Sequence, residues 1–302
     1  MLKKQSVIEL FDESEISKYR RLFFETIDEI KNDYFNEIST REFTESYINF
    51  ESVVMKAIGY RFYLKILNDS FFDQVSEKVK YVNKENNSEY LRHPIFYTRI
   101  AYPEKNISDL SLLSSQPHYD RSYDLYAYTL WLALENIDME TGGLCFFNNN
   151  EQVDKFFKVK WGEKNKYNFD LYEANHNEID PLIHDKIIHP KLNAGQAYLF
   201  DSNILHCGTR SKSKNRVSFD FRFVNKKALE KTDVKTKTLF DLFSNKPHEI
   251  LSKNLFLIGD YIAANKINSN VESSLPYELV NSKLDIKIPN QKLSWRFENS
   301  FI

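Results

Sequence analysis

The sequence predicts a mainly β protein with flanking helices. Short strand-like runs, separated by Gly, Asn and Asp turns, fill residues 91–226. No long helical pattern separates these runs, which favours an antiparallel β-sandwich or barrel over βαβ units. A hydrophobic content of 42% is enough for a packed core, and no linker divides the chain. We therefore expect one domain over residues 1–302.

The flanking regions are predicted from apolar periodicity. Residues 1–90 are expected to form an N-terminal helical region, because apolar side chains recur there at helical spacing between charges. Within the β core, residues 148–190 form a polar insertion that we expect to cover the mouth of a barrel. Residues 227–302 are predicted to hold helices and then extended chain. The aromatic residues of the insertion that could form a lid over a small molecule are Trp161, Tyr167, Phe169 and Tyr172.

Composition excludes several classes of function. The formal net charge of −2 gives no electrostatic reason to expect a nucleic acid or an anionic membrane as partner. The two cysteines, Cys145 and Cys207, form no C-x-x-C pair, so a zinc ribbon or a thioredoxin motif is not expected. Both cysteines are predicted to pack in the core. With neither a secretory signal nor an apolar run of membrane-spanning length, we expect a cytoplasmic protein.

Residues 215–223, NRVSFDFRF, show the strongest local pattern. Apolar and polar side chains alternate along them, so in a strand one face is apolar and the other is polar or charged. A half-exposed edge strand is one interpretation, and taken alone it is the commoner one. The alternative is a strand whose polar face points into a barrel that holds a charged ligand. The polar face carries Arg216, Ser218, Asp220 and Arg222.

A metal site is predicted from three side chains. His118 and Asp120 are two residues apart, so in extended chain they lie on the same side. A surface His beside a surface Asp is the alternative for this short motif. His206 precedes Arg216 by ten residues, and we expect a strand, a turn and a second strand to bring these two together as an antiparallel pair. Two His and one carboxylate form the facial triad that leaves three positions open on Fe(II).

These pieces resemble the Fe(II)/2-oxoglutarate-dependent dioxygenases, and among them the phytanoyl-CoA dioxygenase-like family. The resemblance covers residues 91–226 and rests on HYD, WLALENIDMETGGLCFF, GQAYLFDSNILHCGT and RVS, in that order. Two features depart from the family pattern. Gln196 stands where the family often has Asp, and NNNEQ replaces the usual Pro-Gly-Ser-His, which puts the substrate side in doubt rather than the metal.

The resemblance implies a double-stranded β-helix, or jelly roll, with Fe(II), 2-oxoglutarate and O2 as cofactor and co-substrates. It assigns to Arg216 the distal carboxylate of 2-oxoglutarate, with a further hydrogen bond from Ser218. Arg222 lies on the same face of the predicted strand and is the competing candidate for binding this carboxylate. Arg99 is a weaker candidate. Trp131 matches a strand tryptophan near the co-substrate, although a core tryptophan is equally compatible with its position. Thr129 shares its face and is expected to contact 2-oxoglutarate.

The predicted activity is hydroxylation of an unactivated C–H bond in a small organic molecule such as a specialised metabolite, an amino acid, a sugar or an acyl derivative. Desaturation, epimerisation or cyclisation by the same oxidant is the alternative within the class. A jelly-roll protein that binds a ligand without redox turnover is the alternative outside it. No partner other than the small-molecule substrate is predicted, and the sequence says nothing of oligomeric state.

Overall fold

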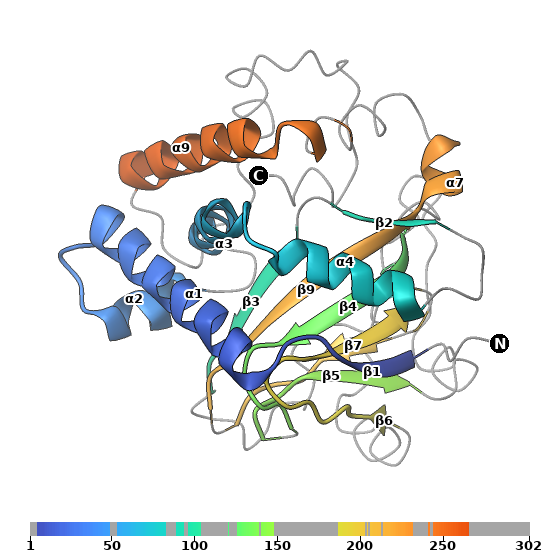
Figure 1. Cartoon of the computed structure of the whole chain (residues 1–302). Coiled ribbons are helices and arrows are strands. Elements are labelled where there is room, and N and C mark those ends of the chain that lie inside the picture. The colour runs from blue at the N-terminus through green and yellow to red at the C-terminus, as the bar shows by residue number, and fades with distance from the viewer. Residues whose placement is uncertain are drawn as a thin grey trace, which may run out of the picture.

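The computed structural model of the chain describes residues 5–48, 53–82, 89–93, 96–103, 120, 126–138, 140–147, 187–202, 204, 206–212, 214–231, 241 and 244–265. Over these ranges, helices cover one side of a large sheet and a smaller sheet lies on its other side (Figure 1). The predicted class, sheet-rich with flanking helices, is confirmed.

The large sheet has six strands in the order β1-β7-β4-β9-β2, with β3 also paired to β9. The small sheet has the order β6-β5-β8, and all pairings in both sheets are antiparallel. The strands are β1 (Gln5–Glu9), β2 (Tyr90–Arg92), β3 (Tyr97–Ala101), β4 (Tyr126–Ala133), β5 (Leu144–Phe147), β6 (Ile187–Ile188), β7 (Gln196–Asp201), β8 (His206–Gly208) and β9 (Arg216–Asn225).

The N-terminal region is helical except for its first strand. Asp12 caps α1 and forms a capping box with Glu15, which satisfies the first free backbone N–H groups of the helix. The expectation of helix throughout residues 1–90 is wrong at β1, which pairs with β7. Five residues carry no helical or strand periodicity of their own, so this pairing is a tertiary effect. The helices are α1 (Glu13–Tyr34), α2 (Thr40–Tyr47), α3 (Val53–Ile66), α4 (Phe71–Val82), α7 (Lys226–Glu230) and α9 (Pro247–Asn265).

A glycine fixes the junction between β1 and β7. Gly195 has a φ of 87°, and its carbonyl oxygen accepts hydrogen bonds from the backbone N–H groups of Leu10 and Phe11. A Cβ atom at this position would lie 2.3 Å from the Phe11 carbonyl oxygen. Only glycine combines the left-handed backbone with so close an approach, so the turn into β7 depends on it.

The large sheet is buried on both faces, because its strands alternate between two hydrophobic cores. In β4, Leu130 and Leu132 pack toward the helices, whereas Trp131 and Ala133 pack between the sheets. In β7, Leu199 faces the helices. The core between the sheets comprises Trp131, Ala133, Ile137, Phe146, Leu192, Tyr198 and Phe200.

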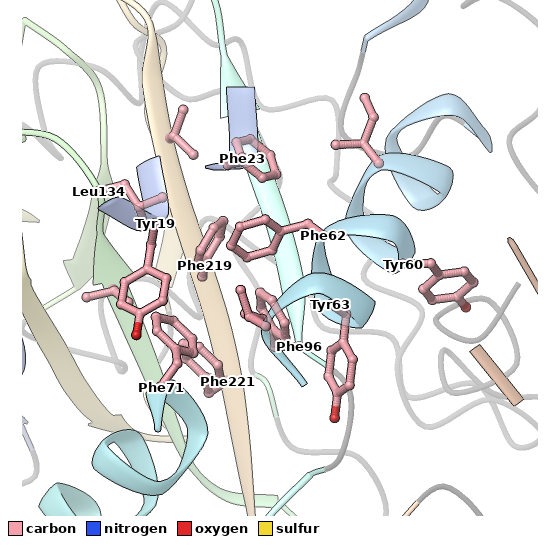
Figure 2. Close-up of a cluster of buried hydrophobic side chains, with 14 of the residues drawn as sticks. Tyr19, Phe23, Tyr60, Phe62, Tyr63, Phe71, Phe96, Leu134, Phe219 and Phe221 are labelled. Carbon is pink, nitrogen blue, oxygen red and sulfur yellow. The ribbon is translucent and has the colours of Figure 1, made fainter. Parts of the chain in front are cut away.

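Strand β9 is central rather than peripheral, so the edge-strand interpretation of residues 215–223 is wrong. Its apolar face packs against aromatic side chains from α1, α3 and α4 (Figure 2). The ring of Phe219 lies 5.4 Å from that of Phe23, 5.2 Å from that of Phe62 and 5.1 Å from that of Phe96. Its polar face is buried as well, between the two sheets.

Other predictions along the chain meet different outcomes. The predicted insertion ends too late at residue 190, because Ile187 and Ile188 form β6 and pair with β5. Helices occur in the C-terminal region, as predicted. The predicted extended end lies outside the described residues, as do the lid aromatics Trp161, Tyr167, Phe169 and Tyr172.

Both cysteines are fully buried, as predicted, and face each other across β5 and β8 with a distance of 2.9 Å between their sulfur atoms. Burial and the contact with Cys145 raise the pKa of the Cys207 thiol. Among the described helices, none combines the length and the apolar character that crossing a membrane requires.

Phe219→Ala should lower the free energy of unfolding by about 3–5 kcal/mol, because the change opens a cavity among packed aromatic rings. Phe256→Ala is the matched control, since that side chain is 68% exposed on α9 and its loss should change stability by no more than about 0.5 kcal/mol. Urea denaturation of the two variants measures both values. Equal midpoints would contradict the packing described for β9.

Candidate functional site

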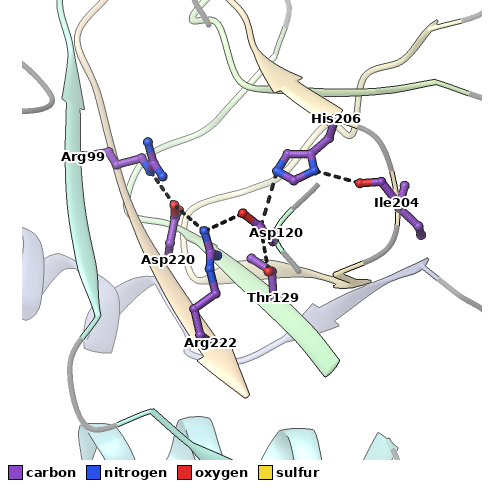
Figure 3. A network of polar contacts seen from close by, with 7 residues as sticks. All are labelled: Arg99, Asp120, Thr129, Ile204, His206, Asp220 and Arg222. Carbon is purple, nitrogen blue, oxygen red and sulfur yellow. Dashed lines mark hydrogen bonds and ion pairs between the residues drawn. The ribbon is translucent and has the colours of Figure 1, made fainter. Parts of the chain in front are cut away.

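The structure brings Asp120 and His206 together between the two sheets. His206 begins β8, and its Nε2 atom lies 3.4 Å from Oδ2 of Asp120 (Figure 3). Both side chains are only 3% exposed. His118, the other predicted ligand, lies outside the described residues. Within the described part of the chain, no third His, Cys, Asp or Glu joins these two in a metal-binding group.

A hydrogen bond sets the tautomer of His206. Its Nδ1 atom is 2.9 Å from the carbonyl oxygen of Ile204, which can only accept, so Nδ1 carries the proton. Nε2 then presents a lone pair to Oδ2 of Asp120. Two lone pairs that face each other repel unless a cation lies between them. Two ligand atoms about 2.1 Å from one ion and at right angles lie about 3 Å apart, so this pair suits a divalent metal.

Burial keeps His206 neutral, which a metal ligand requires. Removal from water lowers the pKa of His206, and this effect outweighs the opposing influence of the Asp120 carboxylate. The ring packs against two aromatic side chains of the inter-sheet core, Phe200 at 4.8 Å and Phe146 at 5.8 Å between ring centroids. A backbone carbonyl and two aromatic rings therefore fix its orientation.

His206 and Arg216 do not form the antiparallel pair that their spacing predicted. His206 lies in β8, which pairs with β5 in the small sheet, whereas Arg216 begins β9 in the large sheet. The chain between them crosses from one sheet to the other instead of making a hairpin within one sheet. The charge of Asp220 nevertheless acts on the pKa of both His206 and Arg216, so both lie near this carboxylate.

Arg216 has unsatisfied hydrogen-bonding capacity inside the protein. Its Nε and Nη1 atoms are buried and have no hydrogen-bond partner among the described residues, and the same holds for Oγ of Ser218 and Nε1 of Trp131. The Arg216 guanidinium lies 5.6 Å from the centroid of the Trp131 ring. Buried donors without partners are rare and costly, so several together indicate a ligand that accepts hydrogen bonds.

Desolvation also acts on the charge of Arg216. Burial, assisted by the nearby positive charge of Arg99, lowers the pKa of Arg216 to about 10, although Asp220 opposes the shift. The group stays protonated at neutral pH and remains a buried cation. An anion that enters this space would relieve both its desolvation and its missing hydrogen bonds.

Thr129 and Arg222 both contact Asp120. The Thr129 hydroxyl donates to Oδ2 over 2.7 Å, and Nη2 of Arg222 donates to Oδ1 over 2.9 Å (Figure 3). From the sequence, Thr129 was expected to contact 2-oxoglutarate, and Arg222 was the alternative to Arg216 for binding its distal carboxylate; both remain predictions. Thr129 and Arg222 are direct cross-strand partners in β4 and β9, which explains why their side chains converge. The alternation of side chains between the two faces of each strand was visible in the sequence, but the register between the strands was not.

The charged network extends to Arg99, whose Nε atom donates to Oδ2 of Asp220. The same oxygen is 3.8 Å from Nη2 of Arg222. Three guanidinium groups thus accompany two carboxylates, which leaves one excess positive charge among these described residues (Arg99, Arg216, Arg222, Asp120 and Asp220). The excess lies at Arg216, where the hydrogen-bond donors are unsatisfied.

The arrangement combines a neutral imidazole and a carboxylate that suit a divalent cation with a buried guanidinium that has no anionic partner within hydrogen-bonding distance among the described residues. A metal and an anion with oxygen atoms could be held here away from water. Such a site can bind a chelating anion on the metal and neutralise a second negative group of the same molecule.

No protein-family model matches the chain, and no curated protein sequence matches it significantly. Solved structures that align with this chain include SnoK, a non-haem α-ketoglutarate-dependent carbocyclase from nogalamycin biosynthesis, at 11% identity and a TM-score of 0.45, covering 74% of this chain and 80% of that one. They include AviO1 from Streptomyces viridochromogenes, at 10% identity and a TM-score of 0.44 (74% and 92%), and Fe-bound EctD from S. alaskensis, at 12% identity and a TM-score of 0.42 (74% and 73%).

His206→Ala should abolish tight binding of Mn(II), because it removes the lone pair that faces Asp120. The fold should persist, because the larger core between the helices and the large sheet does not include His206. Isothermal titration with Mn(II), accompanied by circular dichroism, measures both properties. An unchanged Mn(II) affinity in a folded variant would rule out His206 as a ligand.

Proposed function

We propose that the protein is an Fe(II)/2-oxoglutarate-dependent oxygenase that hydroxylates a C–H bond of a small organic molecule. One observation carries the proposal: the lone pair of His206 Nε2 faces Oδ2 of Asp120, and the buried guanidinium of Arg216, whose Nε and Nη1 atoms make no hydrogen bond to any described residue, lies in the same inter-sheet space. This combination provides two of the three ligands of the metal site together with a site for an anion. The jelly-roll connectivity and His118 as third ligand belong to the same proposal.

Each residue then has a defined task. His118, Asp120 and His206 hold Fe(II) on one side, and Arg216 and Ser218 bind the distal carboxylate of 2-oxoglutarate. Iron with 2-oxoglutarate and O2 supplies an oxidation in which the co-substrate is converted to succinate and CO2 while one oxygen atom is transferred to the substrate. Burial of Asp120 and His206 excludes water from the reacting centre.

A ligand-binding protein without turnover is the competing proposal outside this class. A protein of this kind would not need a buried arginine beside the metal with hydrogen-bond donors available for a carboxylate. Addition of 2-oxoglutarate to the Fe(II)-loaded protein without O2 should give a weak visible charge-transfer band. Admission of O2 should then yield succinate. Tight Fe(II) binding with neither the band nor succinate would favour the binding protein.

Arg216→Leu should raise the dissociation constant for 2-oxoglutarate at least 100-fold, because loss of one partner of a buried ion pair costs about 3–5 kcal/mol. Titration of the charge-transfer band, or of protein fluorescence with Mn(II) bound, measures this constant. Arg222→Leu should change the intrinsic affinity for 2-oxoglutarate less. A larger increase in the dissociation constant for Arg222→Leu than for Arg216→Leu would show that Arg222 binds the distal carboxylate of 2-oxoglutarate.

Turnover should be indifferent to chloride. Halogenating relatives of this class have a small residue in place of the carboxylate ligand, which leaves an iron position for chloride, whereas Asp120 is present here. Mass spectrometry of products formed with and without chloride tests this expectation once a substrate is found. A chlorinated product from the unmodified protein would show that Asp120 is not a ligand.

A further inference from the structure

Both oxygen atoms of Asp120 are held by side chains of the large sheet. Oδ1 accepts from Nη2 of Arg222 over 2.9 Å, and Oδ2 accepts from the Thr129 hydroxyl over 2.7 Å. Thr129 and Arg222 are opposite each other across β4 and β9, so the two members of one cross-strand pair both donate hydrogen bonds to the Asp120 carboxylate. Only Oδ2 also faces Nε2 of His206. The Asp120 carboxylate therefore presents Oδ2, rather than Oδ1, toward the proposed metal position.

We propose that Arg222 is a positioning residue for the metal ligand Asp120, a role that rests on the proposed function and is distinct from co-substrate binding. The guanidinium occupies Oδ1 and keeps it from the metal, which enforces coordination through Oδ2 alone. The carboxylate then takes one coordination position and leaves the others for 2-oxoglutarate and O2. Thr129 assists from the opposite strand by orienting the oxygen that binds.

The surroundings of Arg222 keep it in place for this task. Its Nη2 atom also lies 3.8 Å from Oδ2 of Asp220, and its guanidinium lies 5.6 Å from the centroid of the Tyr97 ring. Arg99 completes a series in which positive and negative groups alternate: Arg99, Asp220, Arg222, Asp120 (Figure 3). A charged side chain restrained by a second carboxylate and an aromatic face can hold a ligand in a fixed orientation.

The contrast with Arg216 separates the two roles. Both arginines come from the same face of β9 and both are 7% exposed. Nη2 of Arg222 donates to the proposed metal ligand, whereas no hydrogen bond joins Nε or Nη1 of Arg216 to any carboxylate among the described residues. An incoming carboxylate can pair with Arg216 at once, but it would have to displace Asp120 to pair with the same nitrogen of Arg222.

The test is the affinity for Mn(II) and Co(II) alone, measured by isothermal titration without 2-oxoglutarate. Arg222→Gln should weaken binding roughly 10- to 100-fold, as expected for loss of a group that orients a metal ligand. The visible spectrum of bound Co(II) should also change, because Oδ1 becomes free to coordinate. Thr129→Val should weaken binding by a smaller factor.

Arg61→Gln is the matched control, because it removes another Arg–Asp pair, with Asp33, that joins α3 to α1. This variant should bind both metals like the unmodified protein. Arg222→Lys retains the positive charge and the network but not the planar guanidinium, and should give an intermediate metal affinity. It replaces Arg222→Gln as the deciding variant if the latter does not fold.

The outcomes separate the inference from the proposed function. If the unmodified protein binds neither metal, the proposed function fails. If it binds both, and Arg222→Gln, or Arg222→Lys in its place, has the same affinity and the same Co(II) spectrum, the positioning role is overturned. It is equally overturned if the variant weakens only 2-oxoglutarate binding, because Arg222 would then bind the distal carboxylate of 2-oxoglutarate.

Discussion

Strand β9 buries one apolar face against the helices and one charged face between the two sheets, and this double burial organises the protein. The apolar face, with Phe219 at its centre, anchors α1, α3 and α4 to the sheet. The charged face carries Arg216, Ser218, Asp220 and Arg222 into a space that would otherwise be hydrophobic. Neither face can be moved by one residue of register without exchanging aromatic rings for charges.

Burial of so many charges is unfavourable unless each finds a partner, and most of the described ones do. Asp220 lies between Arg99 and Arg222, and Asp120 takes bonds from Arg222 and Thr129. Two features of the network indicate ligands: Nε2 of His206 faces Oδ2 of Asp120, and Nε and Nη1 of Arg216 make no hydrogen bond to any described residue. The first suits a cation and the second an anion, so the incomplete parts of the network indicate its function.

The two arginines of β9 show why chemistry cannot be assigned from parity alone. Arg216 and Arg222 share a face, a residue type and the same burial. Their surroundings differ because of what lies opposite: Arg222 has Thr129 as its cross-strand partner and donates to Asp120. Arg216 lies near Trp131, and two of its nitrogen atoms have no hydrogen-bond partner among the described residues. The identity of the neighbours follows from register and from the packing of the two sheets.

The sequence by itself determined what alternation and composition control: helices followed by an antiparallel β core, a strand with one apolar and one charged face, and side chains suited to iron and a dianion. Only the tertiary structure decided that β9 is central, that Gln5–Glu9 pairs with β7, and that His206 and Arg216 lie in different sheets. It also decided that Arg222 bonds to Asp120. Local patterns record which way a side chain points, whereas sheet order and register arise from contacts between residues far apart in the chain.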